Sequence, residues 1–222
     1  MTTNLTSKTL ADLATTYPAA SRIFHRLGLD YCCGGQRALD EACQAASLDP
    51  AEILAEIQSE NPQAGAPQGW PERPLAELAD FIEARYHADL RRELPELIAL
   101  AEKVEARHAD KPTRPQGLAA HLKQVHGAVL DHLMKEERIL FPMIRAGRGS
   151  QAAGPVQVME HEHKDHAANL RRIRELAHDL NPPAEACTSW KALYLRLARL
   201  EADLMEHIHL ENNVLFPRAL CE

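Results

Sequence analysis

One pattern, with His, Glu, Leu, Phe and Pro at the same offsets, occurs at residues 132–142 and again at residues 207–217. Each copy opens with a His-x-x-x-Glu element, His132 with Glu136 and His207 with Glu211. Residues four apart lie on the same face of an α-helix, about 5–6 Å apart at Cβ. The repeat therefore predicts two helices, each of which presents an imidazole and a carboxylate to one ion site.

A further histidine precedes each copy at a matched distance, His87 before the first and His163 before the second. The segment after residue 74 thus reads as two helical hairpins, each with one His on its first helix and His-x-x-x-Glu on its second. Leucine, valine and isoleucine recur on the same faces at helical spacing, so these side chains should point into a core. Two buried, unpaired carboxylates would cost several kcal/mol each, and a cation removes that cost. We therefore predict six metal ligands: His87, His132, Glu136, His163, His207 and Glu211.

Proline and glycine divide the chain into helical segments, and no strand-like alternation is visible between them. We expect an all-α protein with three parts: a small helical domain at residues 1–58, a Pro- and Gly-rich linker at residues 59–74, and an up-and-down four-helix bundle at residues 75–222. Proline and glycine place the bundle helices near residues 75–108, 115–145, 156–179 and 184–213.

Four imidazoles and two carboxylates are too many ligands for one tetrahedral zinc ion. Divided between two ions, they give each ion two histidines, and a glutamate from each second helix can bridge. Mixed imidazole and carboxylate ligation with open positions suits non-haem iron, with manganese next. The order His-x-x-x-Glu differs from the Glu-x-x-His of ferritin-type bundles.

The charge balance excludes some partners. Lys and Arg number 25 against 32 Asp and Glu, a formal charge of −7, which argues against a general binder of nucleic acid or of anionic membranes. No apolar run approaches the ~20 residues that span a bilayer, and residues 1–10 lack the apolar stretch of a signal peptide. Five cysteines in a chain of this size indicate a reduced, cytoplasmic protein.

Two of those cysteines, Cys32 and Cys33, are adjacent and precede Gly34 and Gly35. A disulfide between neighbours is strained and easily reduced, so the pair could be redox-active. The two sulfurs could also bind iron or a nitrosyl as thiolates, or be small buried apolar groups at a turn. Among the other histidines, we expect His25 at the surface, whereas His166 and His209 are candidates for groups that surround the ligands.

The whole chain resembles the RIC family of iron–sulfur cluster repair di-iron proteins, the YtfE/ScdA type, and its bundle resembles a hemerythrin-like domain. It differs from true hemerythrins in that Ala167, not a histidine, follows His163 by four residues. The resemblance rests on five segments: Asp30-Tyr-Cys-Cys-Gly-Gly35, Arg85-Tyr-His87, residues 132–142, Met159-Glu-His-Glu-His163 and residues 207–217.

The resemblance implies a cytoplasmic stress protein, often a homodimer, that restores iron–sulfur proteins damaged by nitric oxide or peroxide, with iron donation as the expected route. Its cofactor would be two non-haem iron ions, bridged by oxo and carboxylate groups and held by the six residues that the repeat selects. Cys32 and Cys33 would then be functional, and Glu162 matches a family carboxylate near the metals. Two alternatives stay open for the same site: a nitric oxide reductase, and a module that binds or senses NO or O2.

Overall fold

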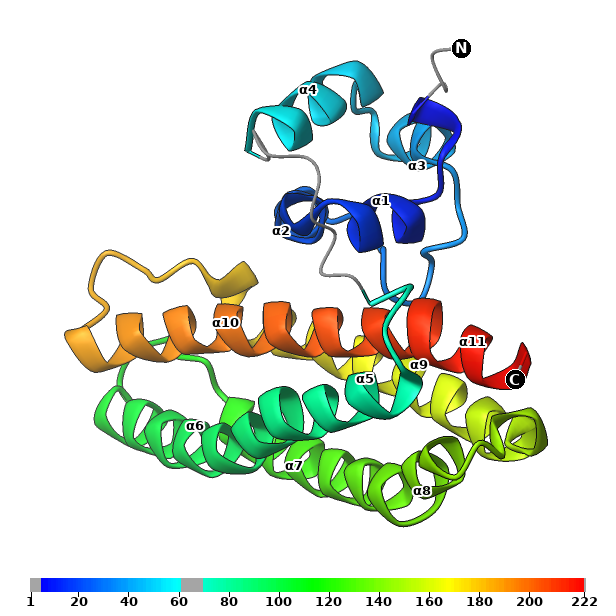
Figure 1. The fold of residues 1–222 in the computed structure, drawn as a ribbon. Coiled ribbons are helices and arrows are strands. Elements are labelled where there is room, and N and C mark those ends of the chain that lie inside the picture. Colours follow the sequence, from blue (N-terminus) through cyan, green and yellow to red (C-terminus); the bar gives the residue numbers. More distant parts are fainter. Residues whose placement is uncertain (1–4, 61–69, 222) are drawn as a thin grey trace.

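The computed structural model describes residues 5–60 and 70–221, and it confirms the all-α prediction. No β-strand occurs in these two ranges, where a single isolated bridge joins Thr9 to Ala38. A small helical unit lies against one side of a bundle of long helices (Figure 1). Most of the expected linker, residues 61–69, lies outside the described residues.

The small unit has four short helices: α1 (Leu10–Thr16), α2 (Pro18–Leu27), α3 (Leu39–Ala46) and α4 (Pro50–Glu60). Pro18 begins α2, where its missing N–H costs nothing. Gly28 ends it with φ of 70°, a left-handed conformation that favours glycine. These helices bury a core of their own, in which Leu13 and Phe24 are fully enclosed.

Four long helical segments form the bundle; three of them consist of consecutive elements, and the third in chain order is a single helix. In chain order these are α5 (Leu75–Ile82), η2 (Glu83–His87) and α6 (Ala88–Arg107); α7 (Leu118–Lys135), η3 (Glu136–Leu140) and α8 (Phe141–Arg145); α9 (Ala153–Leu176); and α10 (Thr188–Leu210), η6 (Glu211–Leu215) and α11 (Phe216–Cys221). Pro95 lies inside α6, which continues beyond it. The short 3₁₀ turns η1 (Leu5–Ser7), η4 (Gly149–Gln151) and η5 (His178–Leu180) lie outside these segments.

Three of the elements, η2, η3 and η6, are single turns of π-helix, which the helical periodicity did not predict. Two of them have a visible cause in the repeated Phe-Pro pair. Pro142 and Pro217 have no N–H for the carbonyl four residues earlier, and their rings crowd it. The preceding N–H groups, of Phe141 and Phe216, instead reach back five residues to the carbonyls of Glu136 and Glu211. The π turns thus begin at the two predicted glutamate ligands, and η2 ends at His87.

The bundle interior contains two apolar clusters. One includes Leu97, Leu133 and Trp190, and the other includes Phe141 and Phe216. Along each long helix the change from one cluster to the other falls at the predicted ligands. The ligand layer is therefore covered by apolar side chains on both sides, which keeps bulk water away from it.

The small unit contacts the bundle through the loop after α2, which reaches the α10–α11 segment (Figure 1). The amide of Asn213 donates hydrogen bonds to the carbonyls of Tyr31 and Cys32. His25, expected at the surface, is half-buried and pairs with Glu201 of α10 at 3.0 Å. Its location follows from packing between the two units, which local sequence does not report. Among the described residues, no helix has the length and apolar character needed to cross a membrane.

Candidate metal centre

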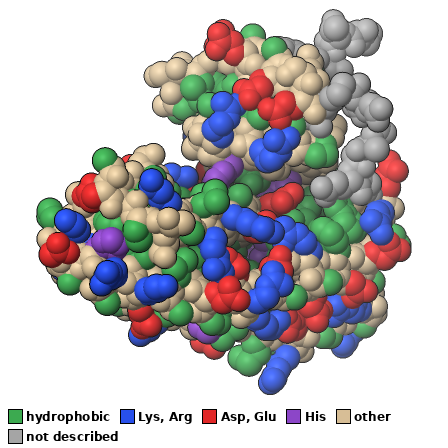
Figure 2. Space-filling view, turned by 90° about the vertical axis from the view of Figure 1, so that its left-hand side faces the viewer, with side chains coloured by type: hydrophobic (Ala, Val, Ile, Leu, Met, Phe, Trp, Pro, Cys, Tyr) green, Lys and Arg blue, Asp and Glu red, His purple; other side chains and the backbone are tan. Residues whose placement is uncertain are grey.

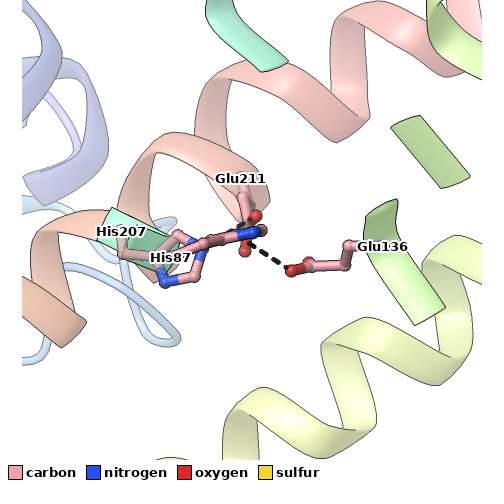
Figure 3. Close-up of side chains that lie close together, drawn as sticks. All are labelled: His87, Glu136, His207 and Glu211. Carbon is pink, nitrogen blue, oxygen red and sulfur yellow. Dashed lines mark hydrogen bonds and ion pairs between the residues drawn. The ribbon is translucent and has the colours of Figure 1, made fainter. Parts of the chain in front are cut away.

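The structure brings all six predicted ligand residues together in the middle of the bundle. Their ligand atoms fall into two groups, one with His87 and His207 and the other with His132 and His163, and both glutamates belong to both groups. Within a group these atoms all lie within 4.8 Å of one another. Figure 3 shows Glu136 reaching from its own helix toward His87, His207 and Glu211. All six side chains are buried, with at most 2% of any one exposed.

Each group takes one histidine from each hairpin, an arrangement that the sequence did not predict. The Nε2 atoms of His87 and His207 lie 3.2 Å apart, as do those of His132 and His163. Oε1 of Glu211 lies 3.0 Å from Nε2 of His207, and Oε2 lies 3.1 Å from Nε2 of His163. A single carboxylate therefore contacts both groups.

The outer nitrogens of three of the histidines are hydrogen-bonded, which fixes their rings. Nδ1 of His87 lies 2.8 Å from Glu137, and Nδ1 of His132 lies 2.9 Å from Glu162. A carboxylate only accepts, so Nδ1 donates in both pairs and Nε2 faces the centre. Each of these two carboxylates also forms an ion pair, Glu137 with Arg91 and Glu162 with Lys135.

On their outer side, the third of these histidines, His163, and the remaining one, His207, contact neutral groups. Nδ1 of His163 donates to Oδ1 of Asn212 at 2.8 Å. Nδ1 of His207 is buried and has no hydrogen-bond partner within residues 5–60 and 70–221, and its ring stacks on Tyr86 with centroids 5.5 Å apart. These four neighbours occupy equivalent repeat positions: Glu137 and Asn212 each follow a ligand glutamate, and Tyr86 and Glu162 each precede a ligand histidine. That repeat signal could have found Glu137, Asn212 and Tyr86, which sequence reasoning missed.

Within the centre, the imidazoles and the carboxylates shift one another's pKa values. Burial alone would raise the pKa of Glu136, but the imidazoles of His132 and His87 hold it well below the ordinary value. Burial likewise opposes protonation of His132, yet the carboxylates of Glu136, Glu211 and Glu162 raise its pKa to about 9. Burial lowers the pKa of His207. A bound cation would take the place of the protons that balance these carboxylates.

The donor atoms fit a metal. Both oxygens of Glu136 and Oε2 of Glu211 are buried and lie 3.1–3.4 Å from imidazole nitrogens, yet they have no well-aligned hydrogen-bond partner among the described residues. Buried polar atoms nearly always have such a partner. Two imidazole nitrogens that bind one ion at ~2.1 Å and at a right angle would lie ~3 Å apart, close to the 3.2 Å seen in both groups. Imidazole and carboxylate donors in a dry, closed layer suit a first-row transition metal.

The remaining predicted residues lie beside this centre. Glu162 is the partner of His132 described above. Cys32 and Cys33 are free thiols, the first buried and the second half-buried, and Sγ of Cys33 lies 3.9 Å from the carbonyl oxygen of His163. The hydrogen bond that the Cys32 thiol donates to Cys33 raises the pKa of Cys32 and lowers that of Cys33.

His166 and His209, expected near the ligands, are both buried. The ring of His166 lies edge-on to His132 at 4.8 Å, and neither of its nitrogens has a hydrogen-bond partner in the described part of the chain. Burial lowers its pKa to about 3, so the ring is neutral. His209 lies between Tyr31 and Thr15, 3.3 Å from the Thr15 hydroxyl. The first therefore borders the centre, and the second joins the small unit to the bundle.

Comparison with known proteins gives two family matches. The model described as Hemerythrin HHE cation binding domain matches residues 78–219, and ScdA_N, a domain of unknown function, matches residues 6–61. Curated relatives match over nearly the whole chain. The iron-sulfur cluster repair protein YtfE of Musicola paradisiaca is 49% identical over 216 residues, 96% of each chain. That of Citrobacter koseri is 50% identical over 213 residues, covering 95% of this chain and 96% of the relative.

The protein of the same name from Escherichia coli O157:H7 is 49% identical over 213 residues, again 95% of this chain and 96% of the relative. The matches extend over both the small unit and the bundle, so the resemblance inferred from the motifs is confirmed. With its hemerythrin-like bundle and its ScdA-type N-terminal segment, the chain belongs to the YtfE family of iron–sulfur cluster repair proteins.

Proposed function

We propose that the six buried ligands hold two non-haem iron ions, one between His87 and His207 and the other between His132 and His163. Glu136 and Glu211 would bridge the two ions. Support comes from the two ligand groups that share both carboxylates and from the match to a cation-binding hemerythrin domain. Two histidines and two shared carboxylates leave positions open on each ion for an oxo bridge, water or a small ligand.

The chain would use this iron to repair iron–sulfur proteins damaged by nitrosative or oxidative stress, with iron as the cargo it donates. The names of its relatives favour this function. The observation that carries it is the pair of ligand groups with common carboxylates, because two ions can then be stored in one dry layer without leaving buried charge unpaired. The Nδ1 partners hold the rings in place while the ions enter or leave.

A repair assay tests this function. Iron-loaded protein is mixed with an enzyme whose iron–sulfur cluster has been damaged by NO, and recovery of that enzyme is followed. Recovery should exceed that given by an equal amount of ferrous salt, and Glu136→Gln should abolish the excess. The exposed Glu160 gives a matched control, Glu160→Gln, which should repair like the unchanged chain. Equal recovery with the protein and with ferrous salt would refute donation.

NO and O2 are the small ligands that the open positions would accept. If the function were instead reduction of NO, the reduced protein would release nitrous oxide over several turnovers. If it were sensing or storage, O2 would bind reversibly without loss of iron. Repair predicts neither result, and gas analysis with parallel iron measurement separates the three.

We also propose that the protein acts in the cytoplasm as a homodimer. Support for self-association is the apolar groove formed by Leu140, Pro155 and Met159, beside which Ile139 and Val158 are about half exposed. Sedimentation at micromolar concentration should give the mass of two chains, and Ile139→Lys with Val158→Lys should give one. Thiol labelling in intact cells tests the compartment, because Cys221 is exposed and should stay reduced in the cytoplasm.

A further inference from the structure

A second cluster of metal-ligating atoms lies outside the bundle centre. The ligand atoms of Asp30, Cys32 and Cys33 fall within 4.8 Å of one another in the loop after α2. Asp30 is exposed, Cys33 is half-buried and Cys32 is buried. One carboxylate and two thiols thus face each other at the edge of the small unit, where the bundle begins.

The loop is held in this shape by its own residues. Oδ1 of Asp30 accepts the backbone N–H of Cys33 at 2.9 Å and lies 3.4 Å from Sγ of Cys32. Two glycines follow, and a Cβ atom on Gly35 would lie only 2.4 Å from the carbonyl oxygen of Tyr31. Asn213 of the bundle also donates a hydrogen bond to the Cys32 carbonyl at 3.1 Å, so the loop is held by the bundle as well as by its own residues. The three donors are therefore preorganised.

The spacing of the donors suits an ion better than a disulfide. The two Sγ atoms lie 3.9 Å apart, whereas a disulfide requires ~2.05 Å. Two thiolates bound at ~2.3 Å to one tetrahedral ion would lie ~3.8 Å apart. A thiolate and a carboxylate oxygen on the same ion would lie ~3.6 Å apart, near the 3.4 Å between Cys32 and Asp30.

We propose that Asp30, Cys32 and Cys33 form a separate site for one thiophilic divalent cation, ferrous iron in the cell. Binding forms two metal–sulfur bonds and one metal–oxygen bond and releases the two thiol protons, so the bound site carries one net negative charge. The fourth position opens to a cavity of about 370 Å³ that Asp30 and Cys32 line. An exchangeable ligand can enter there, as at metal sites with three protein ligands.

The charge of the bound site has a counterpart on the cavity wall. Arg171 and Arg174 line the same cavity. Arg174 is paired with Glu201, whereas Arg171 is exposed and forms no ion pair with any residue that the structure describes. Figure 2 shows Lys and Arg side chains on both sides of the junction between the small unit and the bundle. This basic rim can offset the extra negative charge and attract an anionic ligand to the open position.

The site lies one side chain away from the bundle centre. Asn212 accepts from Nδ1 of His163 at 2.8 Å and donates to the carbonyl of Cys32 at 3.2 Å. Sγ of Cys33 is 3.9 Å from the carbonyl oxygen of His163. We assign the site a role as a station for iron on its way out of the bundle, a role that rests on the proposed function.

Cobalt(II) tests the site itself, independently of repair. The metal-free, reduced chain is titrated with Co²⁺, and the thiolate-to-cobalt charge-transfer band is measured; imidazole and carboxylate ligands give no such band. The band should saturate at one sulfur-bound ion per chain and vanish in Cys32→Ser and in Cys33→Ser. Asp30→Asn should weaken binding by ~10-fold. Cys221→Ser, which removes an exposed thiol elsewhere, is the control and should change nothing. Absence of the band, or its survival in both serine variants, overturns the site.

Iron transfer tests the role. Iron-loaded chains are mixed with a ferrous chelator, and Cys32→Ser with Cys33→Ser should slow iron loss by ~10-fold at unchanged initial iron content. A normal rate in that double variant, with the cobalt band confirmed in the parent, overturns the transit role and leaves repair untouched. Normal iron transfer without recovery of a damaged cluster enzyme would instead reject the proposed function.

Discussion

The two hairpins of the bundle supply the same ligands but surround them differently. On their outer side, the histidines of the first hairpin contact carboxylates, His87 that of Glu137 and His132 that of Glu162. The histidines of the second hairpin contact neutral groups, His163 the amide of Asn212 and His207 the ring of Tyr86. A carboxylate partner makes an imidazole a stronger donor than an amide or an aromatic ring does. His87 and His132, both on the first hairpin, are thus the electron-rich pair, and His163 and His207 are the weaker pair.

Because each ligand group crosses between hairpins, this asymmetry exists within each proposed ion site rather than between the two sites. Every ion would have one firmly held and one loosely held histidine. The loose side belongs to the second hairpin, which also holds the cysteine loop through Asn212 and Asn213. The predicted ligand positions are thus repeated in the two hairpins, whereas the groups around them differ. This difference makes the second hairpin the side from which the ions would be released more easily.

The largest expected effect comes from the shared carboxylates. Glu136→Ala and Glu211→Ala should each remove nearly all iron from both positions, because each glutamate belongs to both groups. Iron per chain after reconstitution is the measurement, with Glu160→Gln as the control. A variant that kept one full ion would show that its glutamate serves only one position.

Removal of the outer partners should distinguish the hairpins. Glu137→Gln and Glu162→Gln should weaken iron binding by ~10- to 100-fold, the usual range for such neighbours, whereas Asn212→Ala should weaken it by less. Competition with a chelator of known affinity gives the values. Equal losses at all three positions would contradict the proposed difference between the pairs of histidines.

Acid should loosen the attachment of the small unit to the second hairpin. Burial by itself would raise the pKa of Glu201, but its bonds to His25 and Arg174 hold that pKa below the ordinary glutamate value. A lowered folded-state pKa stabilises the fold above the unfolded value, ~4.3, and this contribution disappears as pH falls through the folded value. At pH 7, Glu201→Gln should therefore cost about 2 kcal/mol of unfolding free energy.

That deficit should shrink as the pH is lowered from 5 toward 3, a window set by ~4.3 for an ordinary glutamate and the lower folded pKa of Glu201. Denaturant unfolding of both chains at matched pH supplies the comparison. A deficit that stayed constant with pH would mean that Glu201 acts through packing rather than charge.

The smallest effect concerns the loop. Asn213→Ala removes its hydrogen bonds to Tyr31 and Cys32, at a cost of about 1 kcal/mol. Amide exchange within residues 31–35 should become about fivefold faster, without change in α7. Asn169→Ala, in α9 where the backbone contacts His121 of α7, should leave the loop unaltered.

That the six predicted ligand side chains meet in the bundle could be predicted from the sequence, because helical periodicity fixes which face a side chain occupies and a repeat makes coincidence improbable. The small helical unit was also predicted, because proline and glycine punctuate its segments locally. The π turns were not predicted, because a backbone hydrogen bond that spans five residues does not change the spacing of apolar residues in the sequence. Pro142 and Pro217 explain two of these turns once the structure is known.

Pairing across the hairpins was missed for a different reason. Which helix faces which depends on packing of whole segments, and no local pattern encodes that choice. The same holds for His25, which finds Glu201 only because the small unit rests against α10. Two of the groups that hydrogen-bond Nδ1 could have been predicted, because Glu137 and Asn212 occupy the same position in the two copies of the repeat.

Two carboxylates common to both ligand groups also govern how the centre would fill. A first ion would displace protons from the imidazoles and orient the carboxylates of Glu136 and Glu211, so a second ion would meet donors already in place. By reciprocity, each ion would strengthen the binding of the other. When iron is limiting, some chains would hold two ions and others none, and chains with a single ion would be rare. The amount of stored iron would then vary with the number of loaded chains, each of which would carry two ions.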